Sequence, residues 1–116
     1  MIKRSAPYAD ILHEVVEKDG ILYLAGVTGE DTTADMAGQP RSITAQIDEL
    51  LAANGSDKNH LLSVTIYITD MKLKPAMNAV WKEWLSPDQV PARATIGVSD
   101  LDGCLIEVVA IAAKAG

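Results

Sequence analysis

The pattern of apolar and polar residues predicts two β-strands near the start of the chain. Residues 11–17 and 21–25 are rich in β-branched and aliphatic side chains, and Asp19-Gly20 lies between them. Asp-Gly tolerates the positive φ angles of a type I′ turn, so the pattern predicts a β-hairpin. Residues 26–38 follow, with many Gly, Thr, Asp and Glu residues and little periodicity. A connection of this length indicates either a mobile segment or part of a functional site.

A helix, a strand and a second helix are predicted next. Pro40 suits a first helical turn, Asn54-Gly55 suits a helix end, and the apolar stripe between them consists of Ile43, Ile47, Leu50 and Leu51. Residues 62–69 alternate in polarity, as in a strand with one drier face. The second helix begins at Pro75, and its apolar stripe consists of Met77, Val80, Trp81, Trp84 and Leu85.

Two more strand-like segments end the pattern. Residues 92–98 and 104–112 are joined by a connection that contains Asp102-Gly103. The predicted order is therefore β-β-α-β-α-β-β, in a single α+β domain that covers residues 1–116. Both helices must bury their stripes, so we expect them to pack on one face of the sheet. Because the last strand is apolar on both faces, we expect a second copy of the chain to cover the other face.

Composition narrows the classes of partner. Hydrophobic residues make up 48% of the 116 residues and Phe is absent, so the core must be aliphatic around two Trp residues. The formal net charge of −6 opposes nucleic-acid binding, since nucleic-acid binders usually display a basic face. No segment has the pattern of a signal peptide or the length of a bilayer span, so we expect a cytoplasmic protein with no membrane partner.

Arg93 is the first candidate functional residue. Strand alternation places Arg93 and Thr95 on the face opposite Ala94 and Ile96. An enclosed guanidinium needs an anionic or carbonyl partner, because burying the charge unpaired costs several kcal/mol, and its planar fork suits a carboxylate. The alternative is an Arg93 that is exposed or paired in a salt bridge.

Glu107 is the second candidate, because it interrupts a run that otherwise reads as a strand buried on both sides. A carboxylate there must be paired or have a raised pKa, and such groups often serve catalysis. The alternative is a structural partner for a Lys or Arg. In a two-residue hairpin at Asp102-Gly103, Arg93 and Glu107 would lie roughly 17 Å apart along the strands. Either the connection is longer and bent, or another subunit completes the site.

Three other residues are poor candidates for chemistry. Cys104 has no accompanying His pattern, so it is expected to act as a small hydrophobic residue. His13 and His60 have no Cys or second His at metal-ligand spacing. We therefore expect no metal site.

Several motifs, in their order and spacing, resemble the reactive intermediate deaminase family, which is RidA-like or YjgF-like. The resemblance covers nearly the whole chain and is carried by Ala6-Pro7-Tyr8, Leu22-Tyr23-Leu24-Ala25-Gly26, Ala53-Asn54-Gly55-Ser56, Val64-Thr65-Ile66-Tyr67-Ile68-Thr69-Asp70-Met71, Met77-Asn78-Ala79-Val80-Trp81, Pro91-Ala92-Arg93-Ala94-Thr95 and Ile106-Glu107-Val108.

The resemblance implies a chorismate-mutase-like fold assembled as a homotrimer, with sites in the clefts between subunits. It also implies hydrolysis of short-lived enamines and imines, such as 2-aminoacrylate, to a 2-oxo acid and ammonia, without a cofactor. Arg93 would bind the carboxylate and Glu107 would position water, while Tyr8 and Asn78 would line the pocket. We add backbone N–H groups near Gly26 and Thr95 as expected ligand contacts.

The sequence departs from the family pattern at two positions. Ala25 stands where a Ser is common, which removes one hydroxyl that could bond a ligand, and Gln39-Pro40 stands where Gln-Thr is usual. A non-catalytic trimer that binds 2-oxo acids through Arg93 is therefore the alternative to a deaminase. RNA cleavage ranks last, because the acidic chain has no basic stripe.

Overall fold

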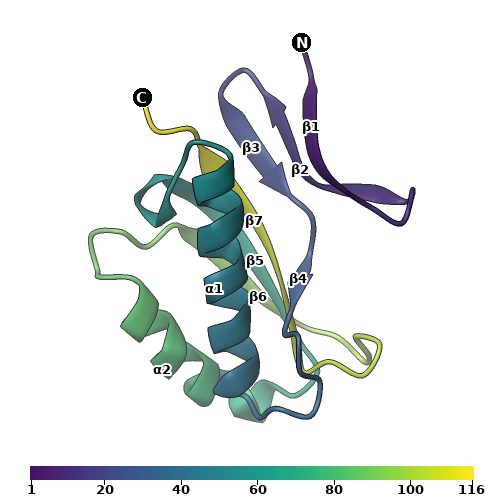
Figure 1. The fold of residues 1–116 in the computed structure, drawn as a ribbon. Helices are drawn as coiled ribbons and strands as arrows, with labels where there is room; N and C mark the ends of the chain where they lie inside the picture. The colour runs from purple at the N-terminus through teal and green to yellow at the C-terminus, as the bar shows by residue number, and fades with distance from the viewer.

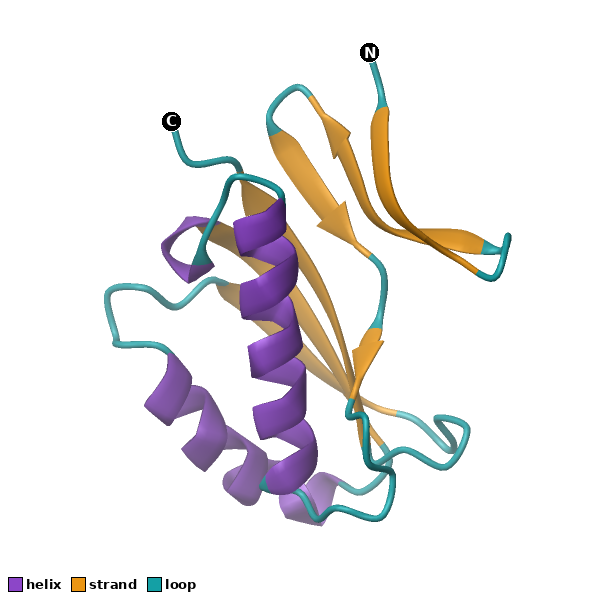
Figure 2. Ribbon diagram, in the orientation of Figure 1, coloured by secondary structure: helices purple, strands orange, loops and turns teal.

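The computed structural model describes residues 1–116 as one mixed β-sheet with both α-helices on the same face (Figure 1). Figure 2 shows the same layers by type of secondary structure. The elements are β1 Lys3–Tyr8, β2 Leu12–Lys18, β3 Ile21–Leu24, β4 Val27–Thr28, α1 Gly38–Ala53, the 3-10 turn η1 Lys58–His60, β5 Leu61–Ile68, the 3-10 turn η2 Met71–Leu73, α2 Lys74–Trp84, β6 Ala92–Gly97 and β7 Ile106–Ala113. The predicted α+β class is confirmed.

The order of strands across the sheet is β1-β2-β3-β7-β5-β6, and β4 pairs with β7 beyond β3. All pairs are antiparallel except β5 and β6, which run parallel because α2 forms the crossover between them. The last two strands therefore do not form a hairpin through Asp102-Gly103. Instead β5 lies between β6 and β7, and Glu107 stands opposite Tyr67.

Two strands are absent from the pattern-based prediction. The strand β1 pairs with β2 around a tight turn in which Ala9 and Asp10 have positive φ angles. Most of its residues are exposed, so no apolar alternation marks it in the sequence. The strand β4 has only two residues and exists because Val27 pairs with Val108 of the long strand β7. Both strands depend on a partner rather than on their own pattern.

The core fills the space between the helices and the sheet. Each predicted helical stripe faces this core: Ile43, Ile47 and Leu51 are buried in α1, as are Met77, Val80 and Trp84 in α2. The sheet contributes every second residue of its central strands, namely Val64, Ile66 and Ile68 from β5 and Ile106, Val108, Ala110 and Ala112 from β7. Alternation in the strands and helical spacing in the helices therefore predicted these core residues, with one exception. The alternation places Leu62 on the same face as Val64, but Leu62 is 47% exposed and Leu61 is buried, because the β5–β7 register shifts between Leu61 and Ser63. No helix of the structure is both long and apolar enough to span a membrane.

The sheet face away from the helices has no cover within one chain. Tyr23 on β3 is 47% exposed and Ile96 on β6 is 43% exposed, although both belong to the paired region of the sheet. Tyr67 and Ile111 lie between them and are half-buried. This apolar face is the one that the sequence assigns to a second copy of the chain.

The connection between β4 and α1 is held by the amide of Gln39, which is 1% exposed. Its Nε2 donates to the carbonyl oxygens of Ala34 at 2.8 Å and Thr32 at 3.2 Å, and its Oε1 accepts from the backbone N–H of Leu105 at 2.9 Å. One side chain thus joins the loop to the segment just before β7. The loop is ordered by this amide, together with the Asp35 carboxylate that accepts from the N–H groups of Ala37 and Gly38.

Replacement of Gln39 by Met should destabilise the fold. The thioether fills a similar volume but leaves the Leu105 N–H and two carbonyl oxygens without their partner, at about 1–3 kcal/mol for a buried unsatisfied group. We expect urea unfolding at fixed protein concentration to show a loss of about 3 kcal/mol. Glu49→Met on the exposed side of α1 is the matched control and should change stability by less than about 0.5 kcal/mol. Equal effects from the two variants would contradict the role of the Gln39 amide.

Candidate functional site

Arg93 lies on β6, an edge strand of the sheet, and points toward α2. It stands opposite the buried Val64 in the β5–β6 register and therefore shares the helix-covered face. Its Nη2 donates to Oδ1 of Asn78 at 2.7 Å, and its Cζ lies 5.4 Å from the centre of the Trp81 ring. Half-burial lowers the pKa of the guanidinium, which nevertheless stays protonated in water. Asn78 is its one hydrogen-bond partner, so other N–H groups are free for a ligand.

Thr95 and a shallow groove on α2 extend this half of the candidate site. Thr95 follows Arg93 by two residues on β6 and shares its face, as strand alternation predicts. A groove of about 540 Å³ lies beside Asn78 and is flanked by Lys74 and Lys82. These residues recur every four positions along α2, and no carboxylate lines the groove. The region around Arg93 is therefore cationic in a chain of net charge −6.

Glu107 forms the other half of the candidate site on the opposite face of the sheet. It stands opposite Tyr67 on β5 and Thr28 on β4, while its neighbours Ile106 and Val108 are buried toward the helices. The carboxylate lies against the α-carbon of Gly26, where a Cβ would overlap Oε2 and come within 2.9 Å of Cδ. Only glycine fits at position 26 without a shift of Glu107. Gly26 and Glu107, which the sequence marked separately, are thus in direct contact.

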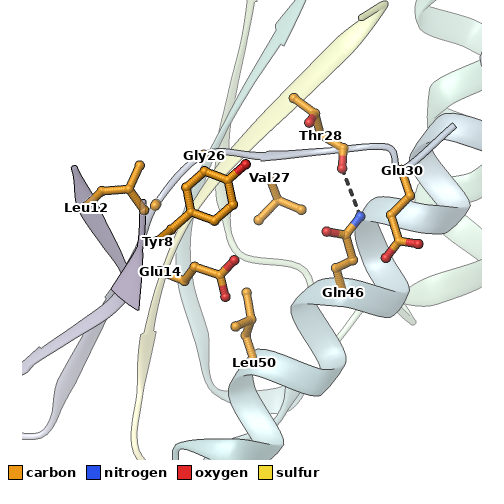
Figure 3. A pocket seen from close by; sticks show the side chains of 10 residues that line it. Tyr8, Leu12, Glu14, Gly26, Val27, Thr28, Glu30, Gln46 and Leu50 are labelled. Carbon is orange, nitrogen blue, oxygen red and sulfur yellow. Dashed lines mark hydrogen bonds between the residues drawn. The ribbon is translucent and has the colours of Figure 1, made fainter. Parts of the chain in front are cut away.

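A cavity of about 430 Å³ opens beside Gly26, between the β1–β2 hairpin, the β3–β4 segment and α1 (Figure 3). Tyr8 and Ala25 line it, and Glu14 and Glu30 supply two carboxylates. Its remaining lining residues are Leu12, Val27, Thr28, Gln46 and Leu50. No Lys or Arg lines this cavity, so it is acidic where the groove on α2 is basic.

Gln46 closes one side of the cavity from α1. Its Nε2 donates to the carbonyl oxygen of Thr28 at 2.8 Å (Figure 3). The same Nε2 also donates to Oγ of Ser42 at 3.1 Å. Glu14 and Gln46 were missed by sequence reasoning, whereas Glu30 falls in the 26–38 connection that the sequence marked as a possible part of a site. Glu14 sits inside an apolar strand pattern, as Glu107 does, and that interruption was the available signal. Gln46 carries no comparable signal, because only folding brings the helix to the cavity.

One chain does not bring Arg93 and Glu107 together. They stand opposite Val64 and Tyr67 of β5, three residues or roughly 10 Å apart along that strand. Two inter-strand spacings add about another 10 Å, and the side chains leave opposite faces of the sheet. The predicted residues therefore fall into two groups, which we call half-sites. Arg93, Asn78 and Thr95 lie in one, whereas in the other Gly26 contacts Glu107 and also lines the cavity with Tyr8.

Comparison with known proteins identifies the family of this chain. The model of the family described as Endoribonuclease L-PSP matches residues 1–114. A RutC family protein of Haemophilus ducreyi is 36% identical over 72% of this chain and 71% of its own length, and one of Pyrococcus horikoshii is 33% identical over 97% and 90%. This chain belongs to the YjgF/RutC family.

A solved structure extends the likeness to the whole fold. The crystal structure of a YjgF family member from Neisseria meningitidis superposes with a TM-score of 0.91 at 32% identity, and the match covers 100% of this chain and 97% of the other. The RidA-like or YjgF-like resemblance read from the sequence is confirmed. YjgF/RutC membership also accounts for a mixed sheet covered by two helices on one face.

Gly26→Ala tests the contact that organises the acidic half-site. The added Cβ must push the Glu107 carboxylate away, so we expect unfolding at fixed protein concentration to show a loss of about 1–3 kcal/mol, as for other overpacked sites. In a Glu107→Ala background the same substitution should cost much less, because the clashing atoms are gone. Additive effects of the two substitutions would show that Gly26 and Glu107 are not in contact.

Proposed function

We propose that this YjgF/RutC family protein hydrolyses reactive enamine and imine intermediates, 2-aminoacrylate and related 2-imino acids, to 2-oxo acids and ammonia. The observation that carries the proposal is the state of Arg93: a half-buried guanidinium fixed by Asn78 at one N–H, with further N–H groups free. Such a fork is suited to the carboxylate of a small 2-imino acid. A bidentate contact would orient the substrate and fix the position of its imine carbon.

Glu107 supplies the second function that hydrolysis requires. In the proposed reaction the Glu107 carboxylate accepts a proton from water as the water oxygen bonds to the imine carbon, and the imine nitrogen takes a proton from solvent. The resulting carbinolamine then loses ammonia as the C–N bond breaks, and the hydroxyl proton passes to solvent to yield the 2-oxo acid. Glu107 releases its proton to the departing nitrogen. The reaction needs no redox step and no cofactor.

The proposed site is completed by a second copy of the chain in a homotrimer. Because Arg93 and Glu107 face away from each other, the substrate would lie between Arg93 of one copy and Glu107 of the next. The charges support this arrangement, since the groove with Lys74 and Lys82 adjoins Arg93 and the cavity with Glu14 and Glu30 adjoins Gly26. A basic surface on one side and an acidic surface on the other suit a head-to-tail contact, which can close into a ring.

A non-catalytic trimer that binds small carboxylates through Arg93 is the second candidate. Ala25 favours it, because this residue lines the cavity beside Gly26 and offers no hydroxyl to a ligand there. Endoribonuclease activity, the description of the matching family model, has weaker support. The net charge of −6 repels a phosphate polyanion.

Substitution at Arg93 and Glu107 tests the deaminase proposal. With 2-imino acids generated by an amino-acid oxidase, we expect Arg93→Ala to lower kcat/KM about 100-fold, equivalent to about 3 kcal/mol of lost charge-assisted hydrogen bonding. Glu107→Gln should lower kcat by about 100-fold or more through loss of the proton acceptor. Arg41→Ala, which removes an exposed Arg paired with Glu83, is the matched control and should keep full activity.

Binding and activity measurements distinguish the deaminase from the binding trimer and from the endoribonuclease. Carboxylate binding in calorimetry without accelerated imine hydrolysis would favour the binding trimer. An Arg93→Ala protein as fast as the wild type would remove Arg93 from the mechanism. RNA cleavage that depends on Arg93 or Glu107 would support the endoribonuclease activity instead.

Charge reversal tests the proposed contact between copies. The double variant Lys74→Glu/Lys82→Glu should shift the protein from trimer to monomer in sedimentation analysis, because two acidic surfaces would then face each other. Adding Glu14→Lys and Glu30→Lys to the same chain should restore the trimer by exchanging the signs. Lys3→Glu/Lys18→Glu makes the same change in net charge on the exposed β1–β2 hairpin and is the control. A fourfold variant that stays as dissociated as the double variant would contradict this pairing of surfaces.

A further inference from the structure

The ring of Trp81 lies beside the charge of Arg93. Trp81 is on α2, one turn after Asn78, and its ring centre lies 5.4 Å from Cζ of Arg93. A guanidinium at this distance from an indole face is attracted by the electrons of the ring. Arg93 is thus held in two ways, by the ring through electrostatics and by Asn78 through one N–H.

Trp81 is itself anchored to the first helix through its neighbour Trp84. The two rings meet edge to face, with centroids 5.4 Å apart and an interplanar angle of 67°. Trp84 is 8% exposed, and its Nε1 donates to both carboxylate oxygens of Asp48 on α1 at 3.1 Å. A continuous chain of contacts therefore runs from Asp48 through Trp84 and Trp81 to Arg93. It fixes the ring relative to the rigid core.

We propose that Trp81 is a positioning residue that holds the Arg93 guanidinium in the orientation needed to receive a carboxylate. The inference rests on the proposed role of Arg93. A single hydrogen bond to Asn78 leaves the guanidinium plane free to turn about that bond, and the long aliphatic stem of arginine adds further rotamers. Contact with the Trp81 face removes this freedom before the ligand arrives. The binding site is then preorganised, which strengthens binding without any new contact to the ligand.

The same geometry makes Trp81 a reporter of ligand binding. The chain contains two Trp residues, Trp81 and Trp84, and both belong to this cluster. A carboxylate that binds Arg93 changes the charge at the face of the Trp81 ring. Tryptophan emission should therefore change as a 2-oxo acid is added, and the change should persist in a Trp84→Phe variant, in which Trp81 is the one emitter.

The experiment compares pyruvate binding by the wild-type protein, Trp81→Leu and Trp81→Phe, measured by calorimetry on the assembled protein. Leu keeps an apolar side chain without a ring, whereas Phe retains an aromatic face. We expect Trp81→Leu to weaken binding about 10-fold and Trp81→Phe to stay within about threefold of the wild type. With imine substrate, Trp81→Leu should raise KM more than it lowers kcat. Val80→Ala, which opens a cavity in the core on the same helix, should lose stability but keep pyruvate affinity.

Four results would overturn the inference. Wild-type affinity in Trp81→Leu would show that the ring does not position Arg93. A loss in Trp81→Phe as large as in Trp81→Leu, or an equal loss in Val80→Ala, would show that packing rather than the aromatic face is responsible. A wild-type protein that binds no pyruvate would remove the role of Arg93 and the inference with it. Ring-dependent pyruvate binding without imine hydrolysis would instead uphold the inference and reject the deaminase reaction, since neither binding nor emission requires turnover.

Discussion

The alternation of side chains across the sheet is the constraint on which the candidate site depends. Successive residues of a strand point to opposite faces, so the register places Arg93 with the helices and Glu107 on the open face. The intervening strand β5 separates them further. No rotamer change can bring a guanidinium through a paired sheet. One chain therefore keeps the two residues apart, and the proposed chemistry, which uses both, would need a second copy.

Different parts of the fold support the two half-sites. The helix α2 carries Asn78 and Trp81, which hold Arg93, and it packs on the core through its own apolar stripe. The acidic half-site depends on backbone geometry, because Gly26 leaves the space that the Glu107 carboxylate occupies. The basic half-site is therefore built by side chains and the acidic one by the absence of a side chain. The two half-sites are therefore independent of each other, so a single substitution can disturb one and leave the other intact.

The surface of the monomer has the features that an assembly would use. The open sheet face carries Tyr23 and Ile96, whose exposure within a paired sheet costs free energy unless another protein surface covers them. Carboxylates line the cavity beside Gly26, and lysines flank the groove beside Asn78. Apolar cover would provide most of the free energy of such a contact, and the opposite charges would set its orientation. The apolar sheet face and the opposite charges would both stabilise the proposed head-to-tail arrangement.

Local patterns determined much of the architecture from the sequence alone. Apolar periodicity predicted both helices, the core strands, the hairpin at Asp19-Gly20 and the packing of both helices on one face. The helices, the core strands and the hairpin depend on neighbours within a few residues, so they are visible in a short window of sequence. The packing of the helices on one face follows from the need to bury both apolar stripes. The same patterns marked Arg93 and Glu107 as charges in unexpected places. The strands β1 and β4 were not predicted, because they form by pairing with another strand and show no apolar pattern of their own.

Only the tertiary structure decided how these pieces meet. Strand order is a long-range property. The sequence left open whether the last two strands form a hairpin, and the structure instead places β5 between β6 and β7. The contact of Glu107 with Gly26, the three hydrogen bonds of Gln39 and the ring beside Arg93 each join residues from separate elements. The sequence by itself determined which residues form the helices and the core strands and which side chains are chemically unusual. The distances between those side chains follow from the folded chain, because packing and register set them together.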